Sequence, residues 1–126
     1  MWGNIGIIAA GAASGAVLRW GLGIWLAGVC SRMAVGTLLA NWIGAYLIGL
    51  LAGFSLHAPT LPEHWRLLLM TGFLGSLTTF SGFSLEVMAM LQSQRWGDAF
   101  ITVCLHLFGS IALTFLGMLT LHTLRA

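Results

Sequence analysis

The chain has 126 residues, of which 59% are hydrophobic and only 6% are charged. An average soluble domain is about 25% charged, so this composition excludes an ordinary cytosolic enzyme and a disordered tail. The net charge of +2 comes from five arginines and three acids. That is too little positive charge for a protein that binds nucleic acid. The composition indicates a single domain whose solvent is the lipid bilayer.

Charged residues and prolines divide the chain into four apolar segments, each longer than the roughly 20 residues that a membrane helix needs. We expect helices at residues 2–26, 33–56, 66–94 and 98–124, with the longest polar connection between the second and the third. The segments are too long and too continuously apolar for the strands of a barrel. The predicted fold class is an all-α integral membrane protein with one four-helix transmembrane domain.

Small residues recur at a spacing of four along the first and second helices, where they let helix backbones approach closely in lipid. We interpret them as packing surfaces. The two cysteines are far apart, match no metal or redox spacing and are interpreted as small apolar residues. The small-residue ridges are Gly11 with Gly15, Gly36 with Ala40 and Gly44, and Gly49 with Gly53.

The arginines do not define an orientation in the membrane. The N-terminus, the second loop and the C-terminus share one side with Arg66 and Arg125, and the other side holds Arg19, Arg32 and Arg95. A difference of one charge is too small for the positive-inside rule to act on. Four helices alone also make a poor pore wall. We therefore hypothesise that the chain inserts in both orientations and pairs as an antiparallel homodimer.

The third predicted helix is the most polar, because residues 71–84 hold six hydroxylic residues and three glycines. Such a stretch has low helix propensity, and we expect a break in the helix near residues 75–79. A break inside the membrane is tolerated only where its backbone groups face protein or water. Freed carbonyls can bind a cation, and the N-terminus of a half-helix attracts an anion. The alternative is a flexible, glycine-rich helix without an ion.

Polar side chains on other helices share faces by helical spacing. Thr37 and Asn41 are four residues apart, and His106 belongs to a stripe of polar residues at steps of four between residues 102 and 114. Each residue alone is explained by hydrogen bonding between helices, but together they indicate a narrow polar path. Glu86 is the one acid well inside a predicted span, since Asp98 only begins the fourth, and it either pairs with His106 or caps a helix.

The chemistry of this path favours an anion over a cation. Amide and hydroxyl groups can donate hydrogen bonds, and Arg19 lies within the first predicted span. Phe80 and Phe83 are three residues apart, and the positive edges of aromatic rings can hold a small anion weakly. Plain packing is the alternative for these two rings.

Three motifs resemble the Fluc, or CrcB, family of fluoride channels over essentially the whole chain. Residues 11–20 (GAASGAVLRW) are similar to the family's glycine-rich stretch ending in arginine and an aromatic residue. The second predicted helix carries Gly36-Thr37-Leu38 followed by Asn41 and Gly44. The third and most specific motif is GFLG at residues 72–75, TTFS at 78–81 and FSLE at 83–86.

The resemblance implies a fold, a function and a set of site residues. It implies an antiparallel, dual-topology homodimer in the bacterial inner membrane, with two fluoride pores. A sodium ion would lie at the dimer centre, held by the backbone carbonyls of Gly75 and Thr78 from both subunits. The side chains that would line the pores are Thr37, Asn41, Phe80, Ser81, Phe83, Ser84, Glu86, His106 and Ser110, and Arg19 would contribute to the positive field of the vestibule. His106 stands where the family more often has tyrosine.

We therefore expect a passive, fluoride-selective channel that exports cytoplasmic fluoride. An enzyme is not expected, because three acids and four histidines form no set of nucleophile, base and acid. The rival hypothesis is a small multidrug-resistance antiporter, which is also a four-helix, dual-topology dimer. Such transporters need a glutamate in the first helix, where this chain has Arg19 and no acid.

Overall fold

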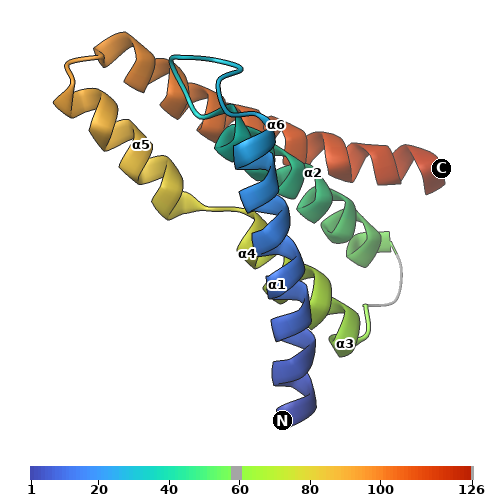
Figure 1. Ribbon diagram of the computed structural model, residues 1–126. Coiled ribbons are helices and arrows are strands. Elements are labelled where there is room, and N and C mark those ends of the chain that lie inside the picture. The colour runs from blue at the N-terminus through green and yellow to red at the C-terminus, as the bar shows by residue number, and fades with distance from the viewer. Residues whose placement is uncertain (58–60, 126) are drawn as a thin grey trace.

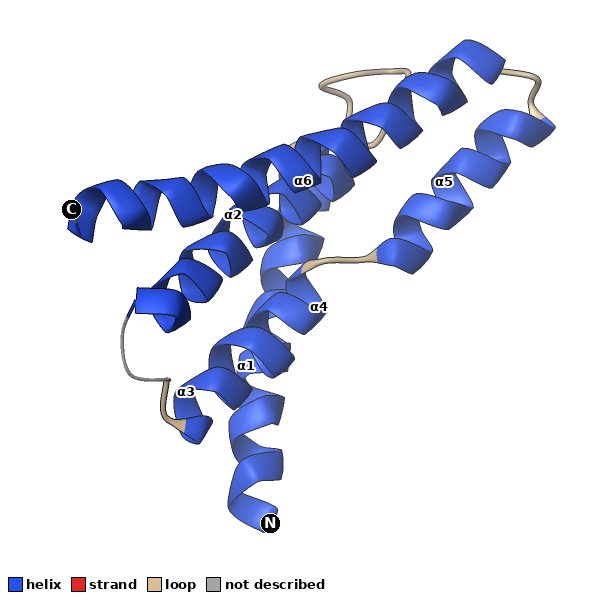
Figure 2. Cartoon of the chain, turned by 180° about the vertical axis from the view of Figure 1, so that it is seen from behind, coloured by secondary structure: helices blue, strands red, loops and turns tan. Residues whose placement is uncertain are grey.

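The computed structural model describes residues 1–57 and 61–125. Residues 58–60 belong to the predicted polar connection, and they lie outside the described residues together with residue 126. The secondary structure within the described ranges is entirely helical, as Figure 2 shows. In chain order the elements are α1 (Trp2–Trp25), α2 (Val35–His57), α3 (Glu63–Arg66), a π-helix η1 (Leu67–Leu74), α4 (Gly75–Leu77), α5 (Phe80–Gln92) and α6 (Trp96–Arg125).

Four helical stretches are long and apolar enough to cross a membrane: α1, most of α2, the continuous run Glu63–Gln92, and α6. This finding confirms the predicted all-helical fold with four membrane helices. The observed helix ends differ from the predicted ones by at most three residues.

The third of these stretches changes its helical geometry along its length. The π-helix η1 has backbone hydrogen bonds to the carbonyl five residues back instead of four. At its end, the N–H of Gly75 donates to the carbonyl of Met70. After α4 the chain is extended at Thr78 (ψ 152°) and Thr79 (ψ 117°), and the helix resumes at Phe80. The extended backbone is thus limited to two residues, and Gly75, which we expected inside the break, is helical.

The physical reason lies in the packing of α4. Leu77 is completely buried, and the N–H of Thr78 still donates to the carbonyl of Leu74 at 3.1 Å. The Thr78 hydroxyl donates to the same carbonyl at 2.8 Å. Helical bonding therefore continues to residue 78, although glycine and serine begin the segment.

Two helix pairs form the body of the molecule (Figure 1). α1 packs along η1 and α4, and α2 packs along α6. Glycines allow the close approach, since a Cβ atom on Gly15 would lie 3.0 Å from the backbone nitrogen of Leu77. A Cβ atom on Gly49 would lie 3.0 Å from the carbonyl carbon of Thr114. The interpretation of these glycines as packing positions is confirmed.

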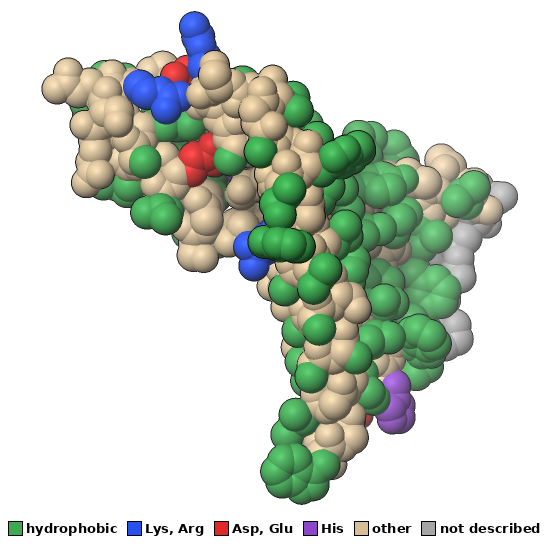
Figure 3. Space-filling view, in the orientation of Figure 1, with side chains coloured by type: hydrophobic (Ala, Val, Ile, Leu, Met, Phe, Trp, Pro, Cys, Tyr) green, Lys and Arg blue, Asp and Glu red, His purple; other side chains and the backbone are tan. Residues whose placement is uncertain are grey.

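α5 is the least packed helix. It leans away from α1 and α4 and meets α6 near the turn that joins them (Figures 1 and 2). At this end Arg95 donates to Asp98 at 2.9 Å and also to the carbonyl of Arg32 in the loop between α1 and α2. Most charged atoms on the face shown in Figure 3 gather there. We call these three residues the charged end.

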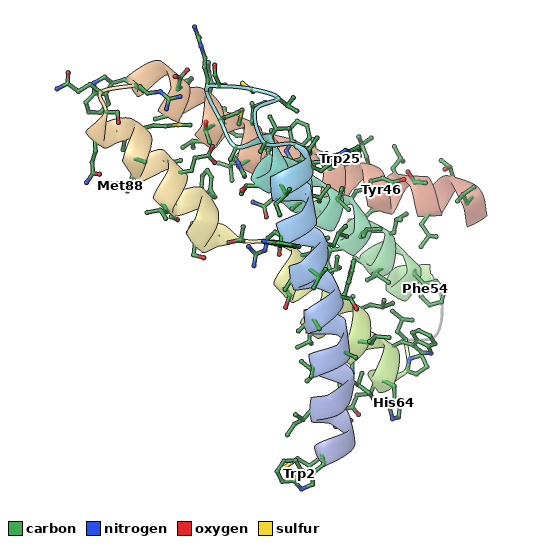
Figure 4. The ribbon with its side chains drawn as sticks, viewed as in Figure 1. Trp2, Trp25, Tyr46, Phe54, His64 and Met88 are labelled. Atoms are coloured by element: carbon green, nitrogen blue, oxygen red, sulfur yellow. The ribbon has the colours of Figure 1, made fainter. Side chains whose placement is uncertain are left out.

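Tryptophans mark the two ends of α1. Trp2 and Trp25 lie at opposite ends of this helix (Figure 4) and are 83% and 77% exposed. Aromatic rings of this kind prefer the two interfaces between lipid and water. Their separation along α1 is that of a helix crossing the bilayer.

Candidate functional site

A hollow of about 540 Å³ lies between α2, α6 and the segment that runs from η1 to the start of α5. Its apolar lining comes mainly from leucine, isoleucine and phenylalanine side chains. Polar groups enter it from several helices, and we call it the polar hollow. Its polar lining residues are Asn41, Thr78, Thr79, His106, Ser110 and Thr114.

Asn41 on α2 is paired with the extended backbone of Thr79. The N–H of Thr79 donates to Asn41 Oδ1 at 2.7 Å, and Asn41 Nδ2 donates to the carbonyl of Thr79 at 3.1 Å. Extended backbone inside a helical protein has lost its helical partners, and buried backbone groups require replacements. The Asn41 amide supplies both replacements at Thr79.

Thr79 also begins α5. Its hydroxyl oxygen accepts a hydrogen bond from the N–H of Gly82 at 2.9 Å, which is the geometry of a helix N-cap. The Ser81 hydroxyl lies 3.3 Å from the same oxygen. Sequence reasoning did not select Thr79 as a site residue. The signal was available, because threonine is a preferred N-cap residue and follows a stretch of low helix propensity.

The carbonyls of Gly75 and Thr78 lose the donors that a continuous helix would supply. Four residues after Gly75, the N–H of Thr79 bonds to Asn41. Four residues after Thr78, the N–H of Gly82 bonds to the Thr79 hydroxyl. Both residues line the polar hollow. Unwound carbonyl oxygens are ligands that sodium takes in membrane proteins, so these two residues fit the expected cation.

His106 on α6 lies where α2, α5 and α6 meet. Its Nδ1 is 3.1 Å from Asn41 Nδ2, and its ring centroid is 4.6 Å from that of Phe83. The side chain is only 5% exposed, and Nε2 has no hydrogen-bond partner among the described residues. A buried polar atom without a partner is rare and marks a place where a ligand or water is expected.

The two phenylalanines differ in their surroundings. Their ring centroids are 5.6 Å apart with planes at 58°. Phe83 is half-buried against His106, whereas Phe80 is 78% exposed at the rim of the polar hollow. The tilted pair presents ring edges as well as faces to the hollow.

Glu86 lies one turn beyond Phe83 on α5. Its Oε2 accepts a hydrogen bond from the N–H of Ala34, just before α2, at 2.6 Å. Its Oε1 is buried and has no partner within the described part of the chain. Of the two sequence alternatives, the structure therefore favours capping over pairing with His106. The capped helix is α2, whose positive N-terminal end attracts a carboxylate.

Thr37 connects these two groups along α2. Residues 34, 37 and 41 follow the three- and four-residue spacing of one helix face. Thr37 is half-buried between the Glu86 contact at Ala34 and the His106 contact at Asn41. Polar groups thus follow one another from the polar hollow toward the charged end.

Arg19 lies within α1 and not in the loop that follows it. Its Nε donates to the carbonyl of Ser76 at 3.0 Å, which ties α1 to α4 beside the extended residues. Five of the residues expected in or near the pores do not line the polar hollow: Arg19, Thr37, Ser81, Ser84 and Glu86. Ser84 is half-buried on α5, and Ser110 lies in the hollow wall.

Sequence reasoning also missed the contact that joins α2 to α6 beside the site. Trp42 donates from Nε1 to the carbonyl of Leu105 at 3.0 Å. A Cβ atom on Gly109 would lie 2.6 Å from that nitrogen, so the glycine makes room for the indole ring. No cluster of three or more histidine, cysteine or acidic side chains suited to a metal was found in the described ranges.

These features define a multi-pass membrane protein whose helices line an open hollow with polar groups beside an interrupted helix. The chain belongs to the CrcB family: the family model described as CrcB-like protein, Camphor Resistance (CrcB), matches residues 6–118. The resemblance seen in its motifs is thereby confirmed.

Curated relatives match nearly the whole chain. A protein of Chromohalobacter salexigens named Fluoride-specific ion channel FluC is 46% identical over 99% of this chain and 95% of its own length. Proteins with the same name from Pseudomonas aeruginosa and Paracidovorax citrulli are 47% and 50% identical. These two alignments cover 97% and 91% of this chain, and 96% and 90% of the relatives.

Proposed function

We propose that this protein is a passive, fluoride-selective channel that lets fluoride leave the bacterial cytoplasm through the inner membrane. Hydrogen fluoride is a weak acid that crosses lipid in its neutral form and ionises in the near-neutral cytoplasm, where the anion is trapped. A selective pore releases it down its electrochemical gradient. The names of the relatives support fluoride as the ion.

The observation that carries the proposal is the buried Nε2 of His106, which has no hydrogen-bond partner in the described part of the chain and lies beside the Phe83 ring. Few full charges are available in the membrane, so hydrogen-bond donors and ring edges attract the anion. A small anion gains more from each short hydrogen bond than chloride does, because its charge is more concentrated. Weak, successive contacts also let the ion leave.

The proposed path begins at the polar hollow and runs between α2, α5 and α6. Phe80, Ser81 and Ser110 lie near the hollow, Phe83 and His106 follow, and Thr37 leads toward Glu86. Arg19 adds positive potential beside the interrupted helix. Ser84, on the same helix as Phe83, completes the expected lining.

The functional unit in this proposal is an antiparallel homodimer with two pores. The polar hollow is open to one side of the single chain, and polar groups facing lipid are costly. A second copy would cover it. Arg19 lies well inside α1. Of the other arginines, Arg32 and Arg95 lie in the loops on one side, and Arg66 in the short helix α3 and Arg125 at the end of α6 belong to the other. This balance supports insertion in both orientations.

A structural sodium ion fits the centre of this dimer. Gly75 and Thr78 would hold it through their freed carbonyl oxygens, supplied by both subunits. The ion would neutralise carbonyl dipoles that otherwise face the hollow without donors, and the interruption at Thr78 and Thr79 would then lie at membrane depth.

The multidrug-antiporter alternative is not favoured. It requires an acid in the first membrane helix, and α1 contains none. The embedded acid of this chain, Glu86, is engaged with the N–H of Ala34.

The test is ion release from liposomes containing purified protein, with a potassium ionophore clamping the voltage. Fluoride efflux, read with a fluoride electrode, is expected, and chloride efflux is not. Phe80→Ile and Phe83→Ile should each reduce fluoride efflux strongly. The matched control is Phe108→Ile, since Phe108 is 63% exposed on α6 and does not line the polar hollow. Wild-type efflux in both pore variants would refute the path, and release of neither anion would refute the function.

A further inference from the structure

The orientation of the Asn41 amide follows from its partner. The N–H of Thr79 can only donate, so the atom 2.7 Å away must be the amide oxygen. The amide nitrogen then faces the carbonyl of Thr79 at 3.1 Å, where it donates. Turning the amide over would set N–H against N–H and oxygen against oxygen. The paired bonds therefore determine the amide orientation.

This orientation determines the proton position on His106. Asn41 Nδ2 carries two hydrogens and no acceptor, and one hydrogen is used by Thr79. The other points to His106 Nδ1 at 3.1 Å. Nδ1 must then accept, which requires it to be unprotonated. A neutral imidazole carries one proton, so that proton is on Nε2.

Nε2 is consequently a buried donor with nothing in the described structure to accept its hydrogen bond. An unsatisfied buried donor is destabilising, and a passing acceptor would relieve this cost. Both hydrogens of the Asn41 amide are engaged by protein atoms, so the free N–H in this group belongs to His106. The ring is held against Phe83, with centroids 4.6 Å apart.

We propose that Asn41 is a positioning residue that holds His106 as the neutral imidazole protonated on Nε2, so that His106 gives the permeating anion a single uncharged donor. The identity of the anion rests on the proposed function, whereas the proton position does not. An uncharged donor attracts fluoride without the full charge that would retain it. Thr79 contributes to the same arrangement, because its backbone orients the Asn41 amide.

Other titratable groups on the helices around His106 are few. Among the described side chains α5 contributes Glu86, which is anchored to Ala34. α2 contributes Tyr46, whose hydroxyl donates to Thr120 at 3.0 Å. On α6 itself the groups are Asp98, Cys104 and His122. Glu86 therefore needs its own control, since its buried Oε1 has no partner in the described residues.

The first experiment observes the proton directly. Nitrogen-15 NMR of histidine-labelled protein in lipid, with His106→Gln used for assignment, should place the His106 proton on Nε2 and leave Nδ1 unprotonated at neutral pH. A proton on Nδ1, or on both nitrogens, would overturn the proposal. This readout needs no ion flux, so it stands even if the protein does not conduct fluoride.

The second experiment changes the positioning residue. In Asn41→Asp a carboxylate of nearly the same shape still accepts from the N–H of Thr79, but it can donate neither to Nδ1 nor to the carbonyl of Thr79. The loss at Thr79 is shared by the Asn41→Asp, His106→Gln double variant and is therefore controlled for. The carboxylate of the variant favours a proton on Nδ1 of His106. In the neutral ring Nε2 then has no proton, so it faces the anion as an acceptor. Only the doubly protonated ring then donates from Nε2. Fluoride efflux of this variant should fall by about tenfold as the pH rises through the titration of the imidazole.

Three controls complete the design, with the leak from protein-free liposomes subtracted at each pH. Wild-type efflux should be independent of pH over the same range, because Nδ1 cannot take a proton without losing its hydrogen bond from Asn41. In the double variant Asn41→Asp, His106→Gln the fluoride efflux should no longer depend on pH. In Glu86→Gln alone the efflux should also not depend on pH, whatever its absolute rate. A flat profile in Asn41→Asp, or a slope that survives His106→Gln, would overturn the proposal. Absence of fluoride efflux in the wild type would instead refute the proposed function.

Discussion

Replacing Thr79 with valine tests the way in which α5 begins. Valine keeps the β-branched shape and the backbone pairing with Asn41, but it removes the hydroxyl that accepts from the N–H of Gly82 at 2.9 Å. Loss of a threonine N-cap costs about 0.5–2 kcal/mol. Lipid offers no water to replace the cap, so the upper half of this range, about 1–2 kcal/mol, is expected.

The adjacent residue provides a matched control. Thr78→Val also removes one hydroxyl, whose bond to the carbonyl of Leu74 is 2.8 Å long. That carbonyl keeps the backbone N–H of residue 78 at 3.1 Å. No group is left without a partner, and the change should cost less than about 0.5 kcal/mol.

The two variants are distinguished by hydrogen exchange and by unfolding. The Gly82 amide should exchange at least about twofold faster in Thr79→Val than in Thr78→Val, which corresponds to a difference of about 0.5 kcal/mol. Tryptophan fluorescence during denaturation in detergent should give a matching difference in the free energy of unfolding. Equal exchange of Gly82 in both variants would show that the cap does not hold the start of α5.

Three further outcomes follow from the packing. Gly15→Ala should destabilise the protein by about 1–3 kcal/mol in thermal unfolding, because a Cβ atom there meets backbone atoms of the third span. Gly21 has open space around it, so Gly21→Ala should be neutral or slightly stabilising. Equal effects of the two substitutions would contradict the packing role of Gly15. Glu86→Ala should cost about 1 kcal/mol and expose the Ala34 amide to exchange, since the N-terminus of α2 loses its carboxylate; unchanged exchange would remove its capping role. Asp98→Asn should lower the free energy of unfolding by less than about 1 kcal/mol and change the melting temperature little, because the partner arginines are exposed. A large loss of stability would indicate a tighter network of ion pairs.

The membrane fold was predictable because length and apolar content dominate it. Four long apolar segments leave no other arrangement in lipid, and the small-residue ridges at Gly15 and Gly49 pack as expected. The π-helix was not predictable, since shifting hydrogen bonds by one residue leaves no pattern in the residue types. The width of the interruption was overestimated because burial of Leu77 outweighs the low helix propensity around Gly75.

The candidate site was predictable in part, because five of the expected pore residues line the hollow: Asn41, Phe80, Phe83, His106 and Ser110. Spacing placed Asn41 and His106 on polar faces, and the structure brings their side chains together. Their individual roles in conduction remain predictions. The capping role of Thr79 had a signal in its residue type, but its backbone pairing with Asn41 had none, because backbone exposure depends on where a helix stops. The choice between two partners for Glu86 needed the loop at Ala34, which is 52 residues away in sequence.

The interrupted third span also bears on how the protein is made. α5 has 13 residues, about 20 Å of helix, and it is too short to cross a hydrocarbon layer of about 30 Å. An 18-residue window within the run Glu63–Gln92 has a mean hydropathy of 1.3, the lowest of the four spans, against 2.1 for the window in α6. During synthesis this span is therefore the weakest signal for insertion. Its stable residence in the bilayer depends on α2, which supplies the Asn41 amide, and on α6, which follows it in the chain. The third span is therefore fully supported only after α6 has left the ribosome.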